Sequence, residues 1–160
     1  WIKNSYRGIL ALDEFFDHKE FSGIKAIVLG GLPSKIFNQI RNKKNFEIHD
    51  YVTTKQLEEY YANAHLFFYP TLNEGFGYPP LEAMKYGTPV VASSISAVTE
   101  ICEDSVLYFD PYSIEEMTNK LIQFQSIDYK RQKQKAIGQY YKIKKKQIKD
   151  LEKITRLILS

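Results

Sequence analysis

Two glutamates and two glycines lie close together in the stretch NEGFGYPPLEAMKYGTP, residues 73–89, where an expected strand turns into an expected helix. Glu74 and Glu82 are eight positions apart, so both can project toward one crevice. A carboxylate accepts two hydrogen bonds from a vicinal diol, such as the hydroxyls of a ribose or another sugar. Gly75 and Gly77 have no side chain and let the backbone approach a ligand closely. This stretch is therefore the candidate binding site.

The helix expected from Pro79 or Pro80 to Tyr86 would add a second kind of chemistry. A helix N-terminus presents unpaired N–H groups and the positive end of a dipole, which favour an anion such as pyrophosphate. A simpler interpretation stays open. In it, Glu82 only complements the helix dipole, Glu74 is a solvated loop residue, and the glycines serve the turn.

Short apolar strands alternate with helices along most of the chain. The expected strands are 25–29, 46–49, 65–69, 89–93 and 106–109; the expected helices are 5–16, 34–41, one opening at 53, one from 79 or 80 to 86, a turn at 98–101, and 113–125. The first strand, KAIVL, has the composition of a strand buried on both faces. This alternation predicts an α/β fold, a Rossmann-like parallel sheet flanked by helices. Such a sheet starts on a strand, whereas this sequence begins WIKN and then a helix, so we expect the first strand to be missing.

Capping residues mark the ends of several expected helices. Ser5 is expected at the N-cap of the first helix, while Thr53 with Gln56, and Ser113 with Glu116, fit capping boxes. Gly87 fits the C-terminal cap of the helix that follows the glycine turn.

The composition changes after residue 127, where Lys and Gln dominate and apolar residues form one helical stripe. We expect a domain at 1–127 and a C-terminal helical tail at 128–160, broken near Gly138 and docked on the domain by its stripe. The lysines at 142 and 144–146 are expected to form a solvated face, with contact to anionic lipid as the alternative.

Bulk properties exclude several classes of protein. The chain has 160 residues with 22 Lys plus Arg against 19 Asp plus Glu, too small an excess to indicate nucleic-acid binding. The single Cys102 excludes an internal disulfide and a multi-cysteine metal site, and is expected in the core. No apolar run approaches the roughly 20 residues of a membrane span. We therefore expect a cytoplasmic protein, with the inner face of the membrane as a possible location.

The run YPTLNEGFGYPPLEAMKYGTPVVAS resembles the C-terminal, nucleotide-sugar-binding domain of family 4 (group 1) retaining glycosyltransferases, which have the two-domain GT-B fold. The family signature E-G-F-G, completed by a second glutamate as E-x7-E, stands here from Glu74 to Glu82. Lys3-Asn4 resembles the family's Lys-Asn turn, and the resemblance extends over residues 1–124. It implies Glu74 as the catalytic residue, in contact with the transferred sugar, and Glu82 as the ligand of the ribose hydroxyls.

The resemblance also implies the other donor contacts. Lys3 would pair with the diphosphate, and the backbone of Gly75, Phe76 and Gly77 would lie beside the sugar. The helix start near Leu81 would face the phosphates, and the base would meet the loop residues Tyr51 and Val52.

By the same resemblance, the full-length enzyme would be a metal-independent hexosyltransferase of glycan or polysaccharide synthesis, with no cofactor besides its nucleotide-sugar substrate. Its acceptor, a glycan or a lipid-linked sugar, would bind mainly to an N-terminal domain, so this chain alone would be nearly inactive. The family's Arg before Lys3 is absent here. Ile95-Ser96-Ala97 replaces a Gly pair that is frequent in the family, and this second departure favours a GDP-sugar over a UDP-sugar as donor. A nucleotide-sugar epimerase and a non-catalytic nucleotide-binding module are the alternatives.

Overall fold

Helices and parallel strands alternate along the chain in the computed structural model. The structure describes residues 3–159. Trp1 and Ile2, at the start of the expected domain, and Ser160, at the end of the expected tail, lie outside the described residues. The strands are β1 Ala26–Leu29, β2 Phe46–His49, β3 Phe67–Tyr69, β4 Val90–Ser93 and β5 Leu107–Phe109. The helices are α1 Ser5–Phe15, α2 Ser34–Phe37, α3 Thr54–Asn63, α4 Tyr78–Lys85, α5 Ser96–Cys102, α6 Ile114–Gln125 and α7 Tyr129–Leu159, with 3-10 turns at Lys19–Phe21 and Lys43–Asn45.

The strands form two parallel sheets. One pairs β1 with β2, Ala26 opposite Phe46, and the other has the order β3-β4-β5. Within the second sheet β4 is central, with Val90 opposite Phe67 and Val91 opposite Leu107. The expected α/β architecture is confirmed.

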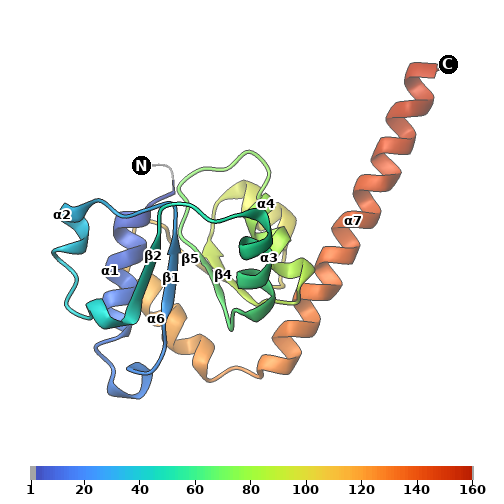
Figure 1. The fold of residues 1–160 in the computed structure, drawn as a ribbon. Helices are drawn as coiled ribbons and strands as arrows, with labels where there is room; N and C mark the ends of the chain where they lie inside the picture. Colours follow the sequence, from blue (N-terminus) through green and yellow to red (C-terminus); the bar gives the residue numbers. More distant parts are fainter. Residues whose placement is uncertain (1–2, 160) are drawn as a thin grey trace.

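The central strand β4 is buried on both faces, and its alternate side chains enter two different cores. Val90 and Ala92 lie in the core formed with α3, α4, α5 and α7, whereas Val91 lies in the core formed with α1 and α6. Cys102 is fully buried in the first of these cores, as expected. The three-stranded sheet is therefore a middle layer between two layers of helices (Figure 1).

Local sequence signals explain where α3 and α6 begin and where α4 ends. Thr53 and Gln56 form the expected capping box, the Ser113 hydroxyl accepts from the Glu116 N–H at 3.1 Å, and Gly87 follows α4 with φ +75°. The expected cap at Ser5 is wrong. Asn4 precedes α1 in a left-handed conformation, φ 54°, and Ser5 is already helical.

The helix expected at 34–41 ends early, at Phe37. The N–H groups of Arg41 and Asn42 donate to the Asp13 carboxylate, at 3.1 and 2.8 Å, in place of helical carbonyls. This bends the chain so that Ile40 is buried. A contact with α1 therefore sets where α2 stops.

Strand β1 departs from its expected burial on both faces, because Ile27 and Leu29 are 41% and 39% exposed. Within residues 3–159, β1 pairs with β2 alone. One edge of β1, and the face that carries Ile27 and Leu29, therefore stay open.

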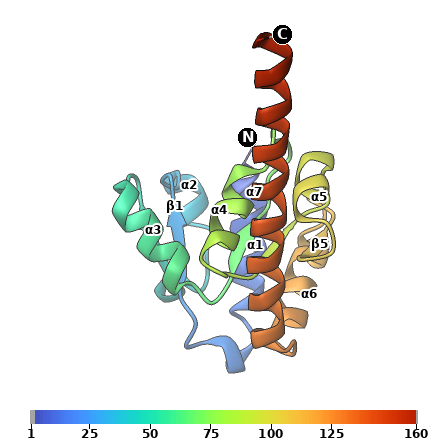
Figure 2. The same cartoon turned by 90° about the vertical axis from the view of Figure 1, so that its right-hand side faces the viewer.

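Helix α7 runs unbroken through Gly138, so the expected break there is wrong. One glycine costs a helix interior about 1 kcal/mol, which its helix-forming neighbours outweigh. The first half of α7 packs on α4 and buries Ala136, Gln139 and Ile143. The second half extends clear of the other elements, as both views show (Figures 1 and 2). The apolar residues on this second half are exposed: Ile148, Leu151, Ile154, Leu157, Ile158 and Leu159.

Candidate functional site

The loop after β3 brings Glu74 to the carboxyl edge of the three-stranded sheet. The Thr71 hydroxyl donates to the Asn73 carbonyl at 3.0 Å within this loop, and Gly75 follows Glu74 directly. In an open parallel sheet, ligands bind beyond this edge. Glu74 therefore lies where the fold places a binding site.

Lys3 forms an ion pair with Glu74 although it lies 71 positions earlier in the sequence. Its position depends on Asn4, which is buried and donates from Nδ2 to the Pro111 carbonyl at 2.7 Å. Arg7 donates to the Asn4 Oδ1 at 3.2 Å. The Asn4 side chain thus holds the start of α1 against the segment that follows β5, and the left-handed conformation of Asn4 directs Lys3 toward Glu74.

Tyr69, the last residue of β3, completes the cluster. The Lys3 ammonium donates to the Tyr69 hydroxyl at 3.0 Å and lies 5.4 Å from the ring centroid, and the hydroxyl donates in turn to the Glu74 carboxylate. From the sequence pattern, Tyr69 was expected only in a core strand. One signal could have revealed its role: Tyr69 has a polar hydroxyl and is the last residue of the strand before the signature loop.

The cluster favours the charged forms of both its ionic members. The hydrogen bond from Lys3, and then that from Tyr69, lowers the pKa of Glu74. Partial burial lowers the pKa of Lys3, but the bonds to Glu74 and Tyr69 outweigh it, so the pKa of Lys3 is raised. Burial and Glu74 raise the pKa of Tyr69. The site therefore holds an ionised pair bridged by a neutral hydroxyl.

A hollow of about 430 Å³ opens beside this cluster, lined by Lys3, Asn73, Glu74 and Gly75. Three of the residues expected to bind donor therefore share one depression. Asn73 was not expected to take part in binding.

Glu82 lies on α4 and its side chain is exposed. Its neighbour is Tyr61 of α3, which is buried and packs edge-to-face on Phe67 at 5.3 Å. Burial, and then the Glu82 carboxylate, raise the pKa of the Tyr61 hydroxyl. The Glu82 side chain is exposed, so its carboxylate is open to hydrogen bonds from a ligand diol.

The start of α4 offers fewer N–H donors than a usual helix. Gly77 is its N-cap with φ +93°, and Pro79 and Pro80 in the first turn have no N–H. The Leu81 N–H donates to the Gly77 carbonyl at 3.4 Å, and the Leu81 side chain is buried in the core. Any anion here would meet the amides of the glycine loop and Tyr78 before that of Leu81.

The remaining expected residues lie apart from the hollow's lining. Phe76 packs against the core and contacts the Tyr78 ring, with centroids 4.5 Å apart. Tyr51, just after β2, is 84% exposed, and Val52 is half-buried. Their proposed contact with the base stays a prediction.

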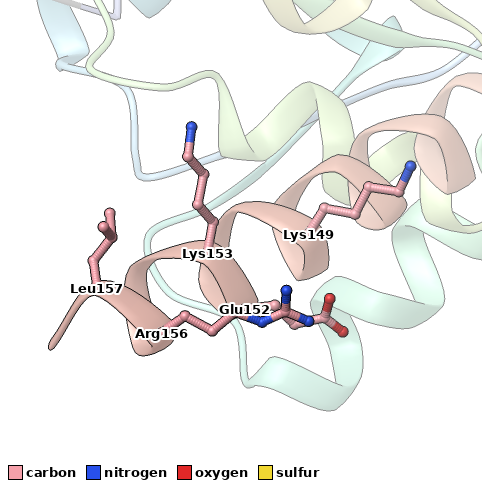
Figure 3. Close-up of a pocket in the computed structure, with 5 residues that line it drawn as sticks. All are labelled: Lys149, Glu152, Lys153, Arg156 and Leu157. Atoms are coloured by element: carbon pink, nitrogen blue, oxygen red, sulfur yellow. The ribbon is translucent and has the colours of Figure 1, made fainter. Parts of the chain in front are cut away.

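A second hollow, of about 370 Å³, lies on α7 alone (Figure 3). It is lined by Lys149, Glu152, Lys153, Arg156 and Leu157, none of them an expected site residue. Of the lysines at 142 and 144–146, Lys142 pairs with Glu103. No helix in the part of the chain described here combines the length and apolar character needed to cross a membrane.

Comparison with known proteins identifies the family. The model of the family described as glycosyl transferases group 1 matches residues 7–144. The O-antigen chain mannosyltransferase B of Escherichia coli is 40% identical over 73 residues, and the O-antigen chain mannosyltransferase RfbU of Salmonella typhimurium is 37% identical over 73 residues. Each match covers 46% of this chain, but only 19% and 20% of those relatives, so the chain corresponds to part of a longer protein in each case.

Solved structures show the same fold at low sequence identity. A trehalose 6-phosphate synthase from Burkholderia multivorans superposes with TM-score 0.77 and 9% identity, over 99% of this chain and 41% of that one. The E. coli trehalose 6-phosphate enzyme, solved with UDP-2-fluoro glucose, gives 0.76 and 14%, over 91% and 38%. The fold is therefore one half of a GT-B structure. With the family model spanning most of its length, this chain belongs to the group 1 (family 4) glycosyltransferases, whose similar members include O-antigen mannosyltransferases of polysaccharide synthesis.

Proposed function

We propose that this chain is the donor-binding domain of an enzyme that transfers a hexose from a nucleotide diphosphate to an acceptor hydroxyl with retention of configuration. The observation that carries the proposal is the cluster of Lys3, Tyr69 and Glu74 beside a hollow at the carboxyl edge of the sheet, with Glu82 on the helix that follows. A cation and two carboxylates suit the three parts of a sugar nucleotide: diphosphate, sugar and ribose.

Each residue has one role in this reaction. Glu82 accepts hydrogen bonds from the ribose hydroxyls, and Glu74 orients the hexose. The bond from the anomeric carbon to the diphosphate oxygen breaks, a bond to the acceptor oxygen forms, and the acceptor's hydroxyl proton is released. Lys3 and the amides of the glycine loop stabilise the charge that develops on the leaving diphosphate. These groups supply positive charge from the protein, so we propose that no metal is needed.

The relatives suggest the substrate class. Several similar proteins are mannosyltransferases, two of them named for the O-antigen chain, which supports a GDP-linked donor and an acceptor in polysaccharide synthesis. A structural neighbour holds a UDP-sugar, so a UDP-linked donor is retained as the second candidate. We propose that another domain holds the acceptor glycan or lipid-linked sugar, so that this chain alone turns over little. Peripheral membrane contact through the lysines of α7 stays a prediction.

Transfer can be tested with the full-length protein, a panel of GDP- and UDP-hexoses, and glycan acceptors. We expect release of nucleoside diphosphate that depends on acceptor, and a product whose anomeric configuration, read by proton NMR, matches that of the donor. Glu74→Gln should lower kcat by at least about tenfold, since it removes a charged hydrogen-bond acceptor from the sugar. Inversion of configuration would contradict the proposal.

The two alternatives give different products in the same assay. An epimerase would release an isomerised sugar nucleotide without acceptor. A non-catalytic module would bind donor in the full-length protein without turnover.

A further inference from the structure

We propose that Tyr69 is a positioning residue of this site, whose hydroxyl holds the Glu74 carboxylate in place when Lys3 leaves it for the donor's diphosphate. This inference rests on the proposed function. It assigns a specific task to a side chain that neither the signature motif nor the sequence pattern marks as functional.

Lys3 and Glu74 are unequal partners in their ion pair. The Lys3 side chain is 60% exposed, whereas that of Glu74 is 16% exposed. A lysine ammonium sits on a flexible stem and can turn toward another anion. Lys3 is therefore the member that can move when a diphosphate enters the hollow, and Glu74 is the member that stays.

Tyr69, in contrast, is fixed by the sheet. It pairs with Ala92 in the β3–β4 register, and its ring is buried and stacks with that of Phe67 at 5.5 Å between centroids. The Ser93 hydroxyl donates to its carbonyl at 3.4 Å. A hydroxyl on such a ring has a defined position and does not depend on where Lys3 points.

The hydroxyl has one proton, and the structure shows where it goes. It donates to Glu74 and accepts from Lys3, so Glu74 has two side-chain donors, Lys3 and Tyr69. Once Lys3 turns to the diphosphate, the Tyr69 bond remains. This donor keeps Glu74 oriented and ionised, with acceptor capacity left for a sugar hydroxyl.

A chemical consequence distinguishes this role from simple packing. While Lys3 is near, Glu74 stays ionised even without the Tyr69 hydroxyl. In the donor complex Lys3 is engaged elsewhere, so loss of the hydroxyl makes Glu74 easier to protonate. The effect should therefore be larger in the enzyme–donor complex than in the free enzyme.

The test compares Tyr69→Phe with a matched control, Tyr108→Phe, in the full-length enzyme. Tyr108 pairs with the same Ala92 from the other side, and its hydroxyl donates to the Glu103 carbonyl at 2.6 Å, in a contact that involves no expected site residue. Both substitutions remove one hydrogen-bonding hydroxyl from a strand. The measurements are kcat and kcat/KM against pH, and the Kd of a nucleoside monophosphate and of a nucleotide sugar.

We expect Tyr69→Phe to lower kcat by about tenfold, to weaken nucleotide-sugar binding, and to leave monophosphate binding unchanged, because a charged hydrogen bond at the sugar end is lost. The acid limb of the kcat profile should move to higher pH, and by more than that of kcat/KM, since kcat reports the donor complex. Tyr108→Phe should leave all these values at wild type, and Glu74→Gln should abolish the acid limb.

Profiles of Tyr69→Phe that coincide with those of Tyr108→Phe, or an acid limb that persists in Glu74→Gln, would overturn the inference. Equal shifts of the acid limbs of kcat and kcat/KM would also overturn the inference, because Lys3 would then contact Glu74 to the same extent in the free enzyme and in the donor complex. These outcomes all assume an active wild type. Absence of donor binding in the wild type would instead refute the proposed function.

Discussion

At the residue scale, two carboxylates in this chain depend on donors that arrive from distant positions. Glu74 receives Lys3, and Asp13 of α1 receives Arg41 and Asn42. The Asp13 side chain is only 3% exposed and accepts from both backbone N–H groups, from the Arg41 Nε at 3.2 Å and from the Asn42 Nδ2 at 3.2 Å. One carboxylate serves the proposed site, and the other fixes the loop between α2 and β2.

Replacing Asp13 with Asn should lower the free energy of unfolding by about 2–3 kcal/mol, because an amide would face N–H groups that need an acceptor. Asp17→Asn is the matched control. Asp17 also pairs with Arg41, at 2.8 Å, but its side chain is 44% exposed, so we expect a loss of less than about 1 kcal/mol. Denaturant unfolding at neutral pH measures both, and equal losses would contradict the assigned role.

The same carboxylate should contribute a pH dependence of stability. Burial raises the pKa of Asp13, but the bonds from Asn42 and Arg41 outweigh burial and leave it below 3.8. A depressed folded-state pKa means that the stabilisation is present above pH 3.8 and is lost as pH falls through the folded-state pKa. The stability difference between wild type and Asp13→Asn should therefore shrink only in strong acid.

At the element scale, the crossing of α7 over the end of α4 depends on Gly87. A Cβ built at this residue would lie 2.8 Å from the Ile137 Cδ1, and its φ of +75° disfavours any other residue. Gly138, one residue after Ile137, has open space around the Cβ position and a helical backbone. The two glycines thus differ in what a methyl group would do.

Gly87→Ala should lower the free energy of unfolding by about 1–3 kcal/mol, through backbone strain and displacement of α7. Gly138→Ala should raise it by about 0.5–1 kcal/mol, because alanine loses less conformational entropy in a helix. Thermal unfolding of both variants measures these two changes in stability. Destabilisation by Gly138→Ala would indicate that α7 is broken there after all.

The elements also show what the sequence could and could not predict. The capping box at Thr53, the strand at 46–49 and the glycine after α4 are short-range signals, and they were predicted correctly. The end of α2 depends on Asp13, and the cap of α1 on the carbonyl of Pro111, contacts that no local pattern reveals. In the site, the two glutamates can be predicted from a motif. The part played by Tyr69 cannot, because it depends on the end of β3 lying beside Lys3.

At the scale of the whole molecule, the two sheets look like parts of one. With a parallel strand between β1 and β3, the order would be the one typical of a Rossmann-like sheet, and the strand would lead directly into Lys3 and α1. The half-exposed Ile27 and Leu29 fit the same idea, since a central strand has both faces covered. We propose that the full-length protein supplies this strand.

Hydrogen exchange can test the strand. In the full-length protein, amides of residues 26–29 and 67–69 should exchange at least tenfold more slowly than in this chain alone, because an added strand pairs with their open edges and raises the opening free energy. The amides of β4, which is paired on both sides already, serve as the internal control. Equal exchange of β1 and β3 in the two proteins would contradict the proposal.

The proposed function requires Glu82 to hold the ribose of a nucleotide sugar, and calorimetry of the full-length protein with GDP, UDP and ADP measures this binding. We expect one of these nucleotides to bind and Glu82→Ala to weaken that binding by at least about tenfold, since the ribose loses a charged acceptor. Glu59→Ala, which removes an exposed glutamate from α3, should bind like wild type. Binding of none of the three nucleotides, or unchanged binding in Glu82→Ala, would contradict the proposed role of Glu82.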